Sequence, residues 1–72
     1  MVRRTPALTK QVRAIYEAEL FEYGSWPYSG SVADQTGLTI GQVIDSVWSE
    51  RADDWRRDVL RRYNERSNNA HS

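Results

Sequence analysis

Four polar side chains lie close together in the middle of this chain and could form hydrogen bonds with the edges of nucleotide bases. They are Thr39, Gln42, Asp45 and Ser46. A glutamine amide can pair with adenine through two hydrogen bonds, a carboxylate can accept one from the amino group of cytosine, and a hydroxyl can contact a base or a phosphate. Presenting these groups together requires a helix, which we predict over residues 39–49.

Basic side chains lie on both sides of this stretch and could contact phosphate groups. The candidates are Arg3, Arg4, Lys10, Arg13, Arg56, Arg57, Arg61 and Arg62. From Ser25 to Glu50 there is no lysine or arginine, and the whole chain has ten basic and ten acidic residues. Since affinity for nucleic acid depends mainly on neutralised phosphates, one copy is expected to bind weakly. We therefore expect a homodimer, because two weakly bound half-sites on one duplex together give a higher affinity.

The composition argues against catalysis and against metal binding. There is no cysteine, and the one histidine is His71, near the end of the 72 residues. Neither a nucleophile with its histidine base nor a metal-ligand set can be assembled from these residues. The carboxylates of Glu17, Glu19 and Glu22 have no pocket that so short a chain could enclose. We expect no enzymatic activity, no cofactor and no small-molecule ligand.

No apolar run is long enough for a membrane helix, and no signal-peptide core follows the basic start of the chain. We therefore expect a cytoplasmic protein with no membrane partner.

The apolar pattern predicts helices and no strand. A first helix begins at Thr5-Pro6 and ends at Gly24. Its apolar stripe recurs at three- and four-residue spacing: Leu8, Val12, Ile15, Tyr16, Leu20 and Tyr23. A loop over 25–30 follows, with Trp26 and Tyr28 folded back to cap the core. The three tryptophans, Trp26, Trp48 and Trp55, are expected in the core.

Two short helices come next. One begins at Ser31, with Asp34 as its capping-box partner, and ends at Gly37; the other begins at Thr39, with Gln42 in the same role. The second is expected to bury one face: Ile40, Val43, Ile44, Val47 and Trp48. Its opposite face is expected to hold Gly41, Gln42, Asp45, Ser46 and Ser49.

The region after Trp48 allows two interpretations. No proline and no glycine after Gly41 interrupts residues 40–66, so one long helix is possible. Adjacent Asp53 and Asp54 favour the start of a separate last helix, which we prefer; it would bury Trp55, Val59 and Tyr63. One domain over 1–66 and a disordered polar tail over 67–72 are expected.

Residues 29–48 combine several features of a two-helix motif. Ala33 is small where the helices touch, Gly37 suits a left-handed turn, and Leu38 and Val43 are apolar where the helices lock together. This pattern resembles the helix-turn-helix of bacterial and phage DNA-binding proteins. Arginine outnumbers lysine nine to one, which suggests an actinobacterium or its phage.

The resemblance implies an all-α bundle of three to four helices whose helix 39–49 enters the major groove of double-stranded DNA. Residues 49–54 show no alternating apolar pattern, so no wing is expected. The function implied is that of a small sequence-specific transcriptional regulator, associated with the nucleoid of a bacterium or of a phage-infected cell.

Plainer alternatives remain open. The pattern could belong to two helices of an ordinary bundle, and the last arginines could form a self-neutralised face with Asp54 and Asp58. The acidic motif could also dock onto another protein, as in a phage antirepressor or an inhibitor of a host regulator.

Overall fold

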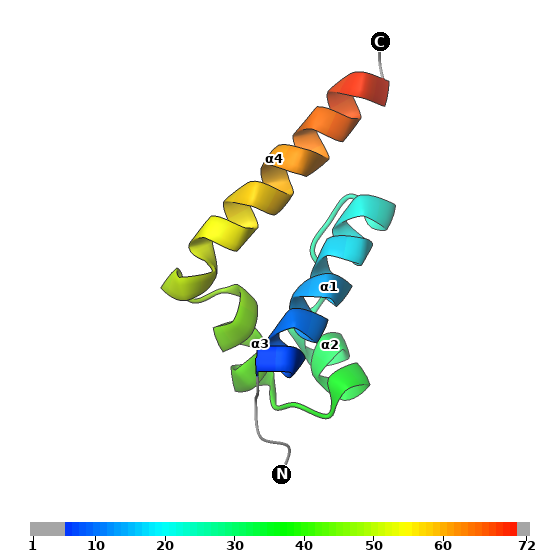
Figure 1. Ribbon diagram of the computed structural model, residues 1–72. Coiled ribbons are helices and arrows are strands. Elements are labelled where there is room, and N and C mark those ends of the chain that lie inside the picture. The colour runs from blue at the N-terminus through cyan, green and yellow to red at the C-terminus, as the bar shows by residue number, and fades with distance from the viewer. Residues whose placement is uncertain (1–5, 71–72) are drawn as a thin grey trace.

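The computed structural model describes residues 6–70, and the side chains of residues 6–66. It is built from helices (Figure 1): α1 (Pro6–Tyr23), α2 (Ser29–Thr36), α3 (Ile40–Val47), the short 3-10 turn η1 (Glu50–Ala52) and α4 (Asp53–Ala70). No strand occurs between residues 6 and 70. The all-α fold, without a wing in this part of the chain, is therefore confirmed.

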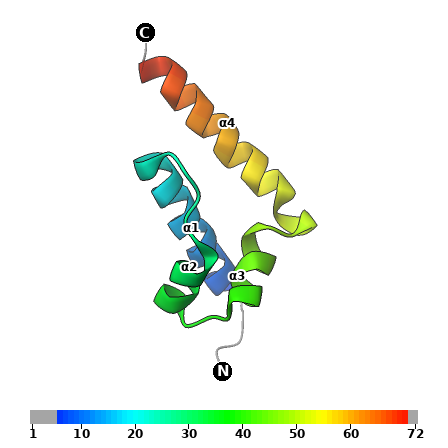
Figure 2. The ribbon, with the colours of Figure 1, turned by 180° about the vertical axis from the view of Figure 1, so that it is seen from behind.

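Helix α1 follows the predicted apolar stripe. It starts at Pro6, where the missing N–H of proline has no helical partner to lose. It ends before Gly24, whose φ of 79° is left-handed and whose N–H donates to the Leu20 carbonyl at 2.9 Å. Tyr23, expected in the stripe, is 68% exposed. It lies on the last turn of α1, beyond the short helices that pack against the first half of α1 (Figures 1 and 2).

The turn between α2 and α3 is built as expected. Gly37 has a φ of 76° and donates its N–H to the Ala33 carbonyl at 2.9 Å. Thr39 caps α3 in a reciprocal box, because the Gln42 N–H donates to Thr39 Oγ1 at 3.1 Å and the Thr39 N–H donates to Gln42 Oε1 at 2.9 Å. These bonds fix where α3 begins.

Helix α2 starts at Ser29 and not at Ser31, so the predicted role of Asp34 in a capping box is wrong. The N-cap position falls on Tyr28, which is extended and makes no side-chain cap. The hydroxyls of Tyr16 and Ser29 lie 2.9 Å apart. This contact ties the first residue of α2 to the middle of α1.

The core lies where α1, α2 and α3 meet. It is formed by aliphatic side chains, mostly valine, around one tyrosine: Val12, Tyr16, Val32, Ala33, Leu38, Val43 and Val47. Beside it the ring centroid of Trp26 lies 5.9 Å from those of Trp48 and Trp55 and 6.0 Å from that of Tyr16. The tryptophans thus contact the core as expected, although Trp48 keeps 42% of its surface exposed.

Helix α3 is rotated relative to the prediction. Ile40, Ile44 and Trp48, expected in the core, are 48%, 43% and 42% exposed, whereas Ser46, expected outside, is 1% exposed. The cause is the position of α1, whose Arg13 Nε donates to the Ser46 carbonyl at 3.0 Å. The Ser46 hydroxyl donates to the Gln42 carbonyl at 2.9 Å, so its burial leaves no polar atom unpaired.

The chain breaks after α3, as preferred, and α4 begins at Asp53. The predicted tail is wrong in part, because α4 continues through residues 67–70 to Ala70. Neither proline nor glycine interrupts this stretch, so nothing in it stops the helix. His71 and Ser72 lie outside the described residues. Figures 1 and 2 both show the last turns of α4 running beyond the three-helix core.

Candidate interaction face

The outward face of α3 carries a line of apolar side chains. Ile40 and Ile44 lie one turn apart on α3, and Trp48 follows as its C-cap residue; each is more than two-fifths exposed, although one side of the Trp48 ring packs against Trp26. We call these three residues the α3 stripe. Gly41 lies beside Ile40 and is exposed too. The stripe is therefore a short apolar ridge on the surface.

The four residues predicted to contact bases are bonded to other groups of the chain or are buried. Thr39 and Gln42 bind each other in the capping box. Ser46 is buried, so its predicted contact with a base is wrong for this structure. Asp45 is bound by the Arg51 guanidinium, with its Oδ2 3.0 Å from Arg51 Nη2. The structure brings these residues onto one helix, but it presents apolar groups between them.

Two of the arginines predicted to bind phosphate instead donate hydrogen bonds to backbone carbonyls in and just after α3. Arg13 donates to the Ser46 carbonyl, and its guanidinium carbon lies 5.4 Å from the centroid of the Trp55 ring. Arg56 is only 17% exposed and donates to the carbonyls of Val47 and Ser49, the latter at 3.0 Å. Basic groups suit the C-terminal carbonyls of a helix. Arg56 thus holds the end of α3 and is poorly placed to meet a phosphate.

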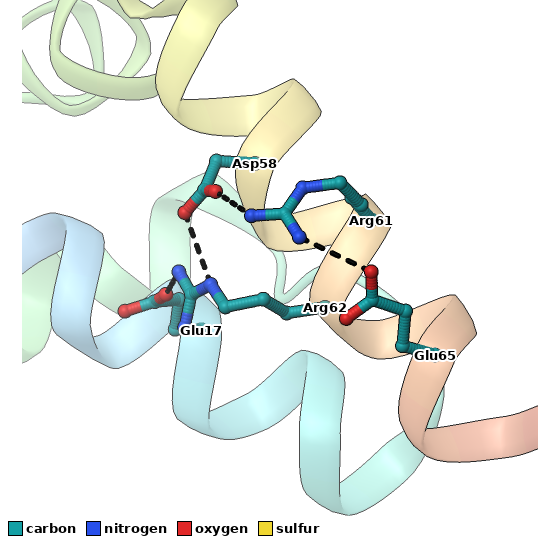
Figure 3. A network of polar contacts seen from close by, with 5 residues as sticks. All are labelled: Glu17, Asp58, Arg61, Arg62 and Glu65. Carbon is teal, nitrogen blue, oxygen red and sulfur yellow. Dashed lines mark hydrogen bonds and ion pairs between the residues drawn. The ribbon is translucent and has the colours of Figure 1, made fainter. Parts of the chain in front are cut away.

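Arg61 and Arg62 of α4 are engaged in ion pairs on its surface (Figure 3). Asp58 accepts hydrogen bonds from Arg61 at 2.6 Å and from Arg62 at 3.0 Å, while Arg61 also reaches Glu65 at 3.1 Å. Arg62 extends across to Glu17 on α1, which links the two helices. We call these five residues the α4 network.

The α4 network shifts the acidity of its members. The hydrogen bond from Arg61, followed by that from Arg62, lowers the pKa of Asp58 below its ordinary value. The bond to Glu17 contributes most to raising the pKa of Arg62. Arg57 is 77% exposed and pairs with Asp53 at 3.0 Å. These predicted phosphate ligands therefore already have carboxylate partners.

The other predicted phosphate ligands lie at the start of the chain. Lys10 is exposed on α1. Arg3 and Arg4 lie outside the described residues.

Sequence reasoning missed the α3 stripe although its four-residue spacing is visible in the sequence. The signal was assigned to the core, because isoleucine and tryptophan are the residue types that cores favour. It also missed Arg51, whose partner Asp45 lies six residues before it and on a different element.

The fold and this face together define a small helical bundle with a turn-linked helix pair and an apolar ridge on its third helix. Comparison of the chain with protein-family models, with curated proteins and with solved structures finds no match. Within residues 6–70 no helix is both long and apolar enough to cross a membrane. The same residues contain no group of acidic, histidine or cysteine side chains arranged to hold a metal ion.

Proposed function

We propose that this protein is a protein-binding module that docks through the α3 stripe. The observation that carries the proposal is the exposure of Ile40, Ile44 and Trp48 along one line of α3. Aromatic and aliphatic side chains grouped on a surface are typical anchors of protein interfaces. Base edges in the major groove, by contrast, offer mainly hydrogen-bonding groups and the thymine methyl.

The charge of the face supports the same proposal. Residues 25–50 contain no lysine or arginine, and the arginines that reach the end of α3 from later in the chain are already bound, Arg51 by Asp45 and Arg56 by the Val47 and Ser49 carbonyls. Contacts with phosphates supply most of the affinity for nucleic acid, and Arg57, Arg61 and Arg62 of α4 are held by carboxylates of this chain. A docking face for another protein needs no such cations.

DNA binding is the second candidate, and the observation that favours it is the arrangement of α2 and α3. Left-handed Gly37 and the capped start of α3 match the turn of a helix-turn-helix. In that case the chain acts as a small phage or bacterial regulator. The first candidate suits an antirepressor or an inhibitor of a host regulator, and both candidates are cytoplasmic functions.

A selection experiment tests docking. A displayed library of amphipathic helical peptides is passed over the immobilised protein, and bound peptides are counter-selected against Ile44→Glu. We expect enriched peptides that bind the Ile44→Glu variant at least about tenfold more weakly, because anchor residues typically contribute 2 kcal/mol or more. Leu60→Glu is the matched control, since Leu60 on α4 is 40% exposed, and it should leave binding unchanged.

A second experiment tests DNA binding. It measures the fluorescence anisotropy of a labelled random-sequence DNA duplex in ~50 mM salt, where non-specific protein–DNA binding is detectable. The docking proposal predicts no binding at micromolar protein. Binding that falls steeply with salt and is lost in a triple variant, Arg57, Arg61 and Arg62 to glutamine, supports DNA binding instead. Failure to enrich any peptide that depends on Ile44 overturns the docking proposal.

A further inference from the structure

The break between α3 and α4 is made without a helix-breaking residue. Residues 42–66 contain neither proline nor glycine, and the helical bonds of α3 continue to Trp48, whose N–H donates to the Ile44 carbonyl at 2.6 Å. The backbone leaves the helix at Ser49, where φ is −77° and ψ is 165°, and it is helical again at Asp53, where φ is −60° and ψ is −45°. A rotation mainly about ψ of Ser49, toward the helical value of about −42°, therefore joins α3 to α4.

We propose that Ser49 is the hinge of an exchange between two copies of this chain. In the exchanged form α3 and α4 are one straight helix, and the α4 segment of each copy packs against α1 of the other. This inference goes beyond the docking function and does not depend on the α3 stripe.

Side chains of two arginines hold the bend. Arg56 donates to the Val47 and Ser49 carbonyls, the latter at 3.0 Å; in a straight helix these carbonyls accept backbone N–H groups from four residues later. Arg51 binds both carboxylate oxygens of Asp45, at 3.0 and 3.2 Å. Residues six apart lie on different sides of a straight helix, so this pair belongs to the bent form. The two forms thus exchange side-chain bonds for backbone bonds.

Helix α4 is attached to α1 by few side chains. Arg62 reaches Glu17 (Figure 3), and the ring centroids of Tyr63 and Phe21 lie 5.8 Å apart. A surface groove of about 300 Å³ remains beside these contacts. It is lined by Ala14, Glu17, Ala18, Phe21 and Arg62. Elements with few packed contacts are the ones that open locally in folded proteins, so α4 is the segment that this fold releases most readily.

A second copy is the surface that suits the released helix. Figures 1 and 2 show the chain turning between α3 and α4, so a straight helix carries α4 away from its own α1. This movement uncovers Val59, which is 0% exposed, and separates Trp55 from Trp26, whose ring centroids lie 5.9 Å apart. Uncovered apolar surface opposes the straight form in a monomer. The second copy presents the same groups in the same arrangement, so exchange restores the contacts that straightening removes.

Two substitutions at the bend test the hinge. Arg56→Gln removes a donor that holds the bend, and we expect a dimer fraction at least about threefold above that of the parent at ~1 mM protein, measured by size exclusion with light scattering. Adding Glu50→Pro should return this variant to a monomer. Proline suits the first position of η1, which follows the extended Ser49, but it interrupts a straight helix. Glu50→Ala, which permits the straight helix, is the matched control and should keep the dimer.

A charge exchange across α1 and α4 tests the contact between copies without altering the bend. Glu17→Arg and Arg62→Glu each place like charges between the two helices of one chain. In a mixed exchanged dimer, both α1–α4 contacts join opposite charges. We expect mixed dimers to exceed the homodimers of either variant by at least about threefold in native mass spectrometry. Arg61→Glu mixed with Glu65→Arg is the control, because both residues lie on α4 and exchange moves them together.

The outcomes distinguish exchange from other associations. A dimer that survives Glu50→Pro overturns the straight hinge, and one that Ile44→Glu breaks is formed through the α3 stripe instead. Mixed dimers no more abundant in the test pair than in the control pair overturn the α1–α4 exchange. Folded monomers of every variant at ~1 mM overturn the proposal as a whole. None of these results depends on whether a peptide binds the α3 stripe.

Discussion

Helices α3 and α4 present opposite kinds of surface, and each differs from what its sequence suggests. Helix α3 looks amphipathic with a polar outer face, yet it exposes an apolar ridge. Helix α4 is rich in arginine and its sequence suggests a phosphate-binding surface, yet Arg61 and Arg62 are bound by carboxylates of the same chain, and Arg56 by Asp53 and by backbone carbonyls. Residue type alone thus misplaces both surfaces, because partners within the fold decide which groups remain available.

The largest effect on stability should come from the arginine that joins the two helices. We expect Arg56→Gln to lower the free energy of unfolding by about 2 kcal/mol, since it leaves partly buried carbonyls at the end of α3 without their charged donor. Its neighbour Arg57, 77% exposed, is the matched control. Arg57→Gln should cost less than about 0.5 kcal/mol, and urea unfolding followed by circular dichroism measures both. Equal losses would show that Arg56 does not support α3.

The next effect concerns the turn that orients α3. Gly37→Ala should destabilise the protein by about 1 kcal/mol, because a left-handed φ of 76° is strained for any residue with a Cβ. Gly41→Ala, on the neighbouring helix turn with ordinary φ, should instead stabilise it. Thermal melting of the two variants side by side checks the opposite signs, and the same sign in both would contradict the geometry of the turn.

The smallest effect belongs to the α4 network. Arg61 and Arg62 lower the pKa of Asp58, so its carboxylate contributes stability at neutral pH. That contribution is lost as the pH falls below the ordinary value of 3.8 and through the lowered value of the folded state. Asp58→Asn should therefore melt slightly below the parent at pH 7, and the two curves should converge as the pH falls below 3.8 and through the lowered pKa of the folded state. A constant difference across this range would contradict the network.

Much of the fold was predictable because its signals are local. Gly24 and Gly37 end helices through their own backbone conformation, and the capping box of Thr39 needs only residues three apart. Adjacent aspartates likewise marked the start of α4. Such features depend on short stretches of chain, which a sequence displays directly.

The rotation of α3 was not predictable for a physical reason. Apolar residues occupy two ridges of this short helix, one with Val43 and Val47 and one with Ile40, Ile44 and Trp48. Either ridge could face the core, and only the packing of α1, through Arg13 and the Ser46 carbonyl, selects the valines. Sequence periodicity contains no information on that choice.

The arginines of the predicted phosphate site show a similar limit. A long side chain can lay its stem on apolar surface and place its charge against distant carbonyls. Arg56 does so at residues seven and nine positions earlier in the chain. The identity of its partners depends on tertiary structure.

The most direct test of the central claim is the affinity of a selected helical peptide for the parent protein, Ile44→Glu and Leu60→Glu, measured by anisotropy with equal folding verified by circular dichroism. Docking through the α3 stripe predicts at least about tenfold weaker binding for Ile44→Glu alone. Equal affinity for all three proteins, together with salt-sensitive micromolar binding of random duplex DNA, would contradict docking and favour the DNA-binding candidate.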